Sequence, residues 1–93
     1  MTKAIDRQEI FKAIEKERER QEKLHPQRKL KKHHDKELIL MQAYIQQNEL
    51  LAVLVEEVGE IGKALQGEGN LRDELIQVAS VCVKWLELKD PAE

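Results

Sequence analysis

Acidic side chains recur in two neighbouring segments of the sequence at spacings that suit a shared cation. Glu57 and Glu60 are three residues apart, and Glu74 and Gln77 repeat that spacing further along the chain. Residues three or four apart lie on the same side of a helix. Mg²⁺ prefers oxygen ligands such as carboxylates and keeps several waters that substrate phosphates can replace. The spacing therefore predicts a site for magnesium, or for manganese, between two helices.

The positions of apolar residues and helix breakers predict an all-α chain, an antiparallel helical bundle. Helices are expected over residues 6–24, 36–66 and 71–88. The polar residues 46–48 are the expected place for a bend that divides the long second helix. Gly67 and Gly69 should end that helix, and Asn70 has the side chain of an N-cap for the third. The basic residues 27–35 are read as a loop.

The carboxylates of these helices fall within apolar faces. On the second helix the predicted inward face consists of Leu50, Leu54, Val58, Ile61 and Leu65. On the third it consists of Leu71, Leu75, Val78 and Cys82. Glu57 lies within the first face and Glu74 within the second. Because buried carboxylates are costly, above all two that face each other, a cation is the expected compensation.

The segment 56–60, Glu-Glu-Val-Gly-Glu, followed by Glu74 and Gln77, resembles the motif of MazG-like all-α nucleoside triphosphate pyrophosphohydrolases. The resemblance covers about residues 50–88. It implies a MazG-like helical bundle, assembled as a homodimer or homotetramer. It also implies Mg²⁺-dependent cleavage of an NTP or dNTP substrate to the monophosphate and pyrophosphate.

Carried over by position, the resemblance assigns Glu57, Glu60 and Glu74 as metal ligands. The family's final aspartate falls on Gln77, whose amide oxygen can bind the metal but brings no charge. Glu56 matches the first glutamate of the motif, and either Glu56 or Glu57 would orient the attacking water. The candidate phosphate-binding residues are Lys63, Arg72 and Lys84.

Length and composition fit one small domain over residues 1–93. A chain of this size buries a modest core, so we expect an oligomer to complete it. No apolar run approaches the roughly 20 residues needed to span a bilayer, which predicts no membrane partner. The start of the chain has no apolar core typical of a signal peptide, and the expected location is cytoplasmic.

Charge is unevenly divided between a basic N-terminal part and an acidic core. Residues 1–36 carry 12 Lys and Arg against 7 Asp and Glu, whereas residues 37–93 carry 4 against 11. The segment 28–34 is basic but lacks interleaved aromatic residues, which argues against a nucleic-acid partner.

Two other functions stay open, a non-catalytic homologue that binds nucleotide and a plain helical interaction protein. A third interpretation concerns the acidic residues alone. Glu57 and Glu74 would then lie at the edge of their faces and reach solvent, or pair with a neighbouring Lys or Arg.

Overall fold

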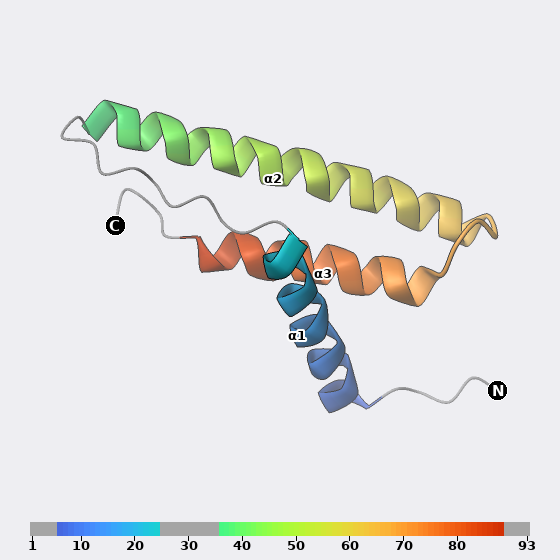
Figure 1. The fold of residues 1–93 in the computed structure, drawn as a ribbon. Helices are drawn as coiled ribbons and strands as arrows, with labels where there is room; N and C mark the ends of the chain where they lie inside the picture. The colour runs from blue at the N-terminus through green and yellow to red at the C-terminus, as the bar shows by residue number, and fades with distance from the viewer. Residues whose placement is uncertain (1–5, 25–35, 89–93) are drawn as a thin grey trace.

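The computed structural model consists of three helices, α1 (Arg7–Leu24), α2 (Lys36–Leu65) and α3 (Leu71–Glu87). It describes residues 6–24 and 36–88, and these contain no strand. Figure 1 shows α2 and α3 running antiparallel as a long hairpin, with α1 lying across α3. The prediction of an all-α chain is confirmed. The expected basic loop, 27–35, lies outside the described residues.

Helix α2 is continuous over 30 residues, so the bend expected at 46–48 is wrong. Gln46, Gln47 and Asn48 are weaker helix formers than alanine, but they keep the backbone N–H that proline lacks. Gln46 and Gln47 are also half-buried, which places them at the helix contact. Packing along the hairpin therefore outweighs their modest propensity.

The connection between α2 and α3 has the cap geometry that the sequence predicts. The N–H of Glu68 donates to the Lys63 carbonyl at 2.9 Å, and that of Gly67 donates to the Ala64 carbonyl at 3.1 Å. These two bonds form a Schellman motif, which needs a left-handed residue, and Gly67 has φ of 93°. Asn70 then caps α3, because its Oδ1 accepts the N–H of Asp73 at 3.1 Å. The turn fixes the two helices in one register.

The face of α2 that packs on α3 is a stripe at steps of three and four residues, each member buried or half-buried. It consists of Ala43, Gln47, Leu50, Leu54, Glu57, Ile61 and Ala64. The prediction for Leu50, Leu54 and Ile61 is confirmed, but Val58 and Leu65 are 51% and 69% exposed. The reason is that α2 carries a second apolar stripe beside the first, and these two residues belong to it.

The buried side of helix α3 matches the predicted face only in part. Val78 is half-buried as predicted, but Leu71, Leu75 and Cys82 are exposed, whereas Val81 and Ser80 are buried. Ser80 is small, and its hydroxyl donates to the Ile76 carbonyl at 2.7 Å, so it can be buried without an unpaired polar atom. Because α3 packs on α2 and also on α1, its buried surface is turned partly away from the predicted stripe.

The molecule is elongated, with extents of 58 × 27 × 23 Å and a radius of gyration of 16.1 Å. A compact domain of this length would have a radius of gyration of about 12 Å. Only Ala43, Leu50 and Val81 are buried apolar residues in the described part of the chain. None of the described helices combines the length and the hydropathy needed to cross a membrane.

Candidate functional site

Two carboxyl groups meet at the interface between α2 and α3. Glu57 comes from the buried stripe of α2 and Glu74 from the first turns of α3, and both are half-buried. The Oε2 atom of each side chain is inaccessible to solvent and has no hydrogen-bond partner among the described residues. The hairpin register brings these atoms together, since α3 begins only six residues after α2 ends. The predicted placement of Glu57 and Glu74 inside their helix contact is confirmed.

The surroundings of Glu57 favour the protonated form of its carboxyl group. Burial raises its pKa first, and the negative charge of Glu74 raises that pKa further. The charges of Glu56 and Glu60 act in the same direction. An electrostatic cost of this kind is relieved by a proton or by a cation.

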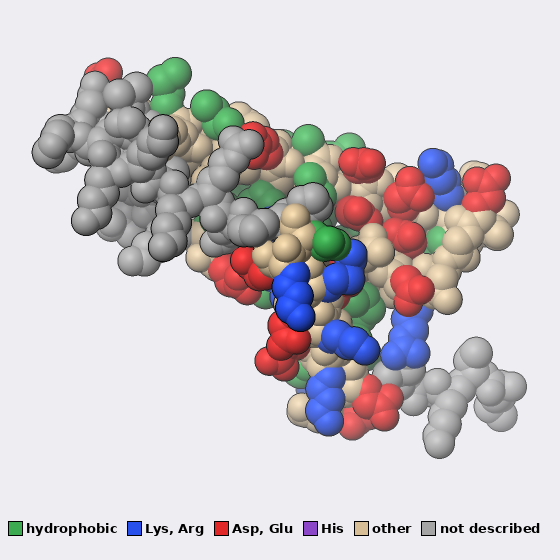
Figure 2. Space-filling model, viewed as in Figure 1, with side chains coloured by type: hydrophobic (Ala, Val, Ile, Leu, Met, Phe, Trp, Pro, Cys, Tyr) green, Lys and Arg blue, Asp and Glu red, His purple; other side chains and the backbone are tan. Residues whose placement is uncertain are grey.

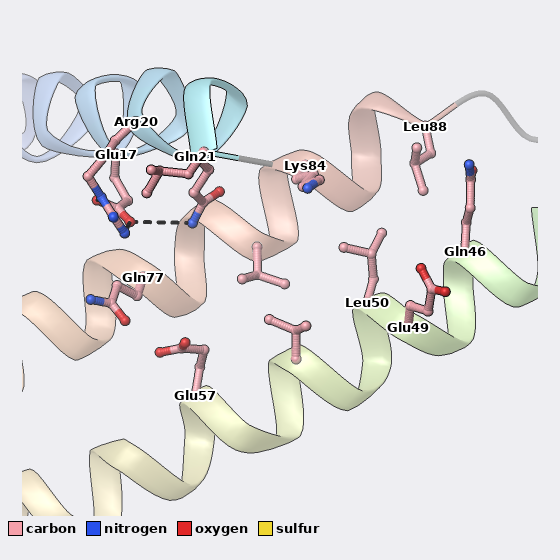
Figure 3. A pocket seen from close by; sticks show the side chains of 13 residues that line it. Glu17, Arg20, Gln21, Gln46, Glu49, Leu50, Glu57, Gln77, Lys84 and Leu88 are labelled. Atoms are coloured by element: carbon pink, nitrogen blue, oxygen red, sulfur yellow. Dashed lines mark hydrogen bonds and ion pairs between the residues drawn. The ribbon is translucent and has the colours of Figure 1, made fainter. Parts of the chain in front are cut away.

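The other predicted site residues near this pair, Gln77, Glu60 and Glu56, have different surroundings. Gln77, one turn after Glu74, lines the same hollow as Glu57, and Figure 3 shows the two side chains facing each other across it. Glu60 turns toward Lys63, with 3.3 Å between its Oε1 and the lysine Nζ. Glu56 is exposed.

Within residues 6–24 and 36–88, no three acidic, histidine or cysteine side chains are grouped so that they alone would hold a metal ion. The described geometry therefore offers a carboxylate pair with an amide beside it. Glu60 could join that pair only after leaving Lys63.

A hollow of about 620 Å³ opens beside the carboxylate pair, between all three helices. One wall is apolar and consists of Leu24, Leu50, Val53, Val81 and Leu88. At one end Glu57 and Gln77 form a polar floor with α1 side chains above them, and at the other end Gln46 and Glu49 lie beside the apolar residues (Figure 3). A pocket with an apolar wall and a few convergent polar groups is the usual form of a small-molecule site.

The three candidate phosphate contacts occupy different places. Lys84 lines the hollow beside the apolar wall. Arg72 lines a second hollow, between α1 and α3. Lys63 lines neither and pairs with Glu60 on the exposed surface of α2. The structure thus places Lys84 in the hollow that Glu57 lines and leaves Lys63 outside it.

Two site residues from α1 were missed by sequence reasoning. Arg20 and Glu17 line both hollows, and the pKa of Arg20 is raised chiefly by its hydrogen bonds and charge pairing with Glu17 and, last, by the charge of Glu57. Their three-residue spacing reads as an ordinary surface ion pair on a charged helix. No sequence signal distinguishes them, because only the crossing of α1 over α3 brings them to the site.

Comparisons with protein-family models, with curated proteins and with solved structures found no match. Function is therefore inferred from the carboxylate pair and from the hollow beside it.

Proposed function

We propose that this chain is a magnesium-dependent nucleotide pyrophosphohydrolase with a MazG-like arrangement of helices. Its substrate is an NTP or dNTP, and its products are the monophosphate and pyrophosphate. The observation that carries the proposal is the pair of buried, unpartnered carboxylate oxygens of Glu57 and Glu74 on successive helices. The motif that resembles the MazG-like family falls on the same residues, which supports the assignment independently of the geometry.

The donor set suits a hard cation. Glu57 and Glu74 supply carboxylate oxygens, and the amide oxygen of Gln77 is a third oxygen donor from the same hollow. Mg²⁺ accepts such ligands and is commonly held by one or two carboxylates together with waters and substrate phosphates. When bound, the ion neutralises charge on the phosphate oxygens. Two acids and one amide supply less charge than the four acidic metal ligands of the family motif, so the affinity for magnesium should be lower.

The other residues of the hollow bind the substrate and handle the proton. Leu50, Val53 and Val81 form an apolar wall that a nucleoside can contact, and Lys84 supplies a positive charge beside it. A water attacks phosphorus, its proton passes to a carboxylate, and the bond from phosphorus to the pyrophosphate oxygen breaks. Glu57 fits the role of proton acceptor better than Glu56, because Glu57 lines the hollow whereas Glu56 is exposed.

The decisive experiment measures pyrophosphate released from the common NTPs and dNTPs by the full chain. We expect release with Mg²⁺ or Mn²⁺ and none with EDTA. Glu68→Gln, which removes an exposed carboxylate in the connection before α3, is expected to retain full activity. Absence of release from every substrate with either metal would overturn the enzymatic assignment.

The second candidate is a non-catalytic nucleotide-binding protein, and Gln77 is the observation that favours it. An amide at the position of the family's aspartate cannot accept a proton in the reaction. Calorimetry separates the two candidates, since nucleotide binding with Mg²⁺ but without turnover would support the second. A helical interaction protein, in contrast, would show neither nucleotide binding nor a response of its stability to magnesium.

We also propose that a second copy of the chain covers the exposed apolar stripe of α2. The stripe runs at steps of three and four residues and includes Met41, Tyr44, Leu51, Val55, Val58 and Leu65. A heptad-like seam of this kind is typical of a surface that packs against another helix. Within the described residues only three apolar side chains are buried, and the single chain is elongated, so the core is incomplete without such a partner.

Val55→Asp should convert the oligomer into a monomer. Val55 is 63% exposed in the single chain, so an aspartate there can be tolerated by the monomer. In the assembly it would become a buried, unpaired charge, which is strongly unfavourable. Sedimentation velocity measures the change in mass. Gln8→Asp on α1 adds the same charge away from the stripe and should leave the mass unchanged. A wild-type chain that sediments as a monomer would contradict the proposal.

A further inference from the structure

The hollow beside the carboxylate pair continues into a second hollow of about 750 Å³ between α1 and α3. The two share Glu17, Arg20 and Gln77, so they form one connected surface with the carboxylate pair near the junction. The second hollow is lined by four cations, which are Lys16, Arg20, Lys23 and Arg72. Figure 2 shows several Lys and Arg side chains over α1, interspersed with Asp and Glu side chains.

Arg20 is the cation at the junction, and its orientation is fixed by Glu17. The arginine Nε and Nη2 atoms donate to the two carboxylate oxygens of Glu17 at 2.9 and 2.6 Å. Glu17 also accepts the Gln21 side-chain N–H at 3.5 Å. A guanidinium carries five N–H donors in a rigid plane, so this pairing uses only one edge. The Nη1 edge has no hydrogen-bond partner among the described residues and remains available to a ligand.

The other three cations extend from Arg20 along the groove. Lys16 and Lys23 lie one turn before and one turn after it on α1, and Arg72 faces them from the first turn of α3. Within the described residues, none of the three forms an ion pair. Glu19 and Asp73 also line the groove and offset part of this charge. Because Glu17 is already paired with Arg20, the groove keeps an excess of cationic donors over free carboxylates.

We infer that the groove between α1 and α3 binds the phosphate chain of an anionic ligand, with Arg20 as its central contact. Placing the nucleoside of that ligand against the apolar wall rests on the proposed function. The binding of the phosphates to Arg20, Lys16, Lys23 and Arg72 does not. A phosphate chain that starts at the carboxylate pair reaches Arg20 first, since Arg20 lines both hollows at their junction and Glu57 lines the first. Bidentate phosphate binding is the chemistry to which the guanidinium edge is suited.

Inorganic tripolyphosphate is the probe, because it contains neither a base nor a sugar. Its affinity is measured by calorimetry with the full chain in EDTA, so that no metal contributes. Arg20→Gln should weaken binding about tenfold, the effect of losing one charged hydrogen-bonded contact. Arg20→Lys keeps the charge but loses the planar guanidinium group, so its affinity for tripolyphosphate should lie between those of the wild type and Arg20→Gln. Lys63→Gln removes an equally exposed lysine outside the groove and should bind like the wild type. Unfolding of the arginine variants is excluded by their circular dichroism.

Binding of tripolyphosphate in the groove can be tested separately from nucleotide hydrolysis. Arg20-dependent binding of tripolyphosphate by a chain that hydrolyses no nucleotide would support the groove and reject the enzyme. Hydrolysis that is unchanged in KM by Arg20→Gln, or a wild type that does not bind tripolyphosphate, would overturn the groove. Equal binding of an oligonucleotide without terminal phosphates, with the same loss in Arg20→Gln, would also overturn it in favour of a nucleic-acid contact.

Discussion

Replacing Glu57 with glutamine is expected to abolish magnesium-dependent pyrophosphate release while making the metal-free protein more stable. Activity should fall by at least about 100-fold, since loss even of residues that only support metal ligands costs 10- to 100-fold. Glutamine has nearly the same shape as glutamate, so the packing between α2 and α3 is preserved. The assay is pyrophosphate release at saturating Mg²⁺, with Glu68→Gln as the control.

The gain in stability follows from the electrostatics of the carboxylate pair. Burial and the charge of Glu74 raise the pKa of Glu57 in the folded protein above its value in the unfolded chain. The folded state therefore binds the proton more tightly, and stability from this group is lost as pH rises through the raised pKa. Near pH 7 the ionised carboxylate costs about 1 kcal/mol, the low end for a buried group without a partner. Removing that cost should raise the melting temperature by about 4 to 8 °C.

The pH and the metal dependence distinguish this explanation from a general packing effect. At about pH 4 the Glu57 carboxyl is protonated, and the difference between wild type and Glu57→Gln should vanish. At neutral pH, magnesium at about ten times its dissociation constant should stabilise the wild type by about 1.4 kcal/mol. Thermal unfolding in EDTA and in Mg²⁺ measures both effects. A variant that is less stable than the wild type in EDTA, or that gains equally from magnesium, would contradict the expected role of Glu57.

The helices could be predicted from the sequence because their ends are marked by local chemistry. Gly67 supplies the left-handed residue of the α2 C-cap, and the Asn70 side chain accepts the N–H that begins α3. Neither interaction depends on the rest of the fold. The bend expected at 46–48 failed for the opposite reason, since nothing local forces it and the contact with α3 favours a straight helix.

Which face of each helix is buried could be predicted only in part. Helix α2 has two apolar stripes side by side, and periodicity alone mixes them, so Val58 and Leu65 were assigned to the wrong one. On α3 the predicted stripe is divided, since Leu71 and Leu75 are exposed in the single chain whereas Val78 is half-buried. The choice between stripes is made by tertiary packing, and a partner copy would bury the remaining ones.

The candidate site shows the same division between local and tertiary information. Glu57 and Glu74 could be placed together because they lie on consecutive helices joined by a short turn. Arg20 could not be placed at the site from the sequence, because its position depends on how α1 crosses α3. These two helices are far apart in the sequence. Charged residues spaced for pairing along one helix, such as Glu17 and Arg20, look the same whether they face solvent or a ligand.

Loss of Arg18 is expected to release α1 from the hairpin. Arg18 is 7% exposed, and its Nη2 lies 2.6 Å from Glu22 Oε1 on α1 and 2.6 Å from Glu87 Oε2 on α3. Its Nε also donates to Glu87 Oε1 at 3.4 Å, so the Nε and Nη2 atoms together bind both oxygens of the α3 carboxylate. Among the described residues this is the one ion pair that joins α1 to another helix. Arg18→Ala would leave two carboxylates near each other without their cation.

The expected cost of Arg18→Ala is about 2 kcal/mol, below the 3–5 kcal/mol of a fully buried pair because Glu87 is half-exposed. Thermal unfolding measures this loss, and trypsin should cleave α1 faster while α2 and α3 stay protected. Lys16→Ala removes an exposed cation two residues away that forms no ion pair among the described residues; it is the matched control and should leave the melting temperature nearly unchanged. Equal protection of α1 in Arg18→Ala and wild type would show that apolar packing alone holds α1 over the hollow. Release of α1 would instead make the Arg18–Glu87 pair the reason that Glu17 and Arg20 reach the carboxylate site.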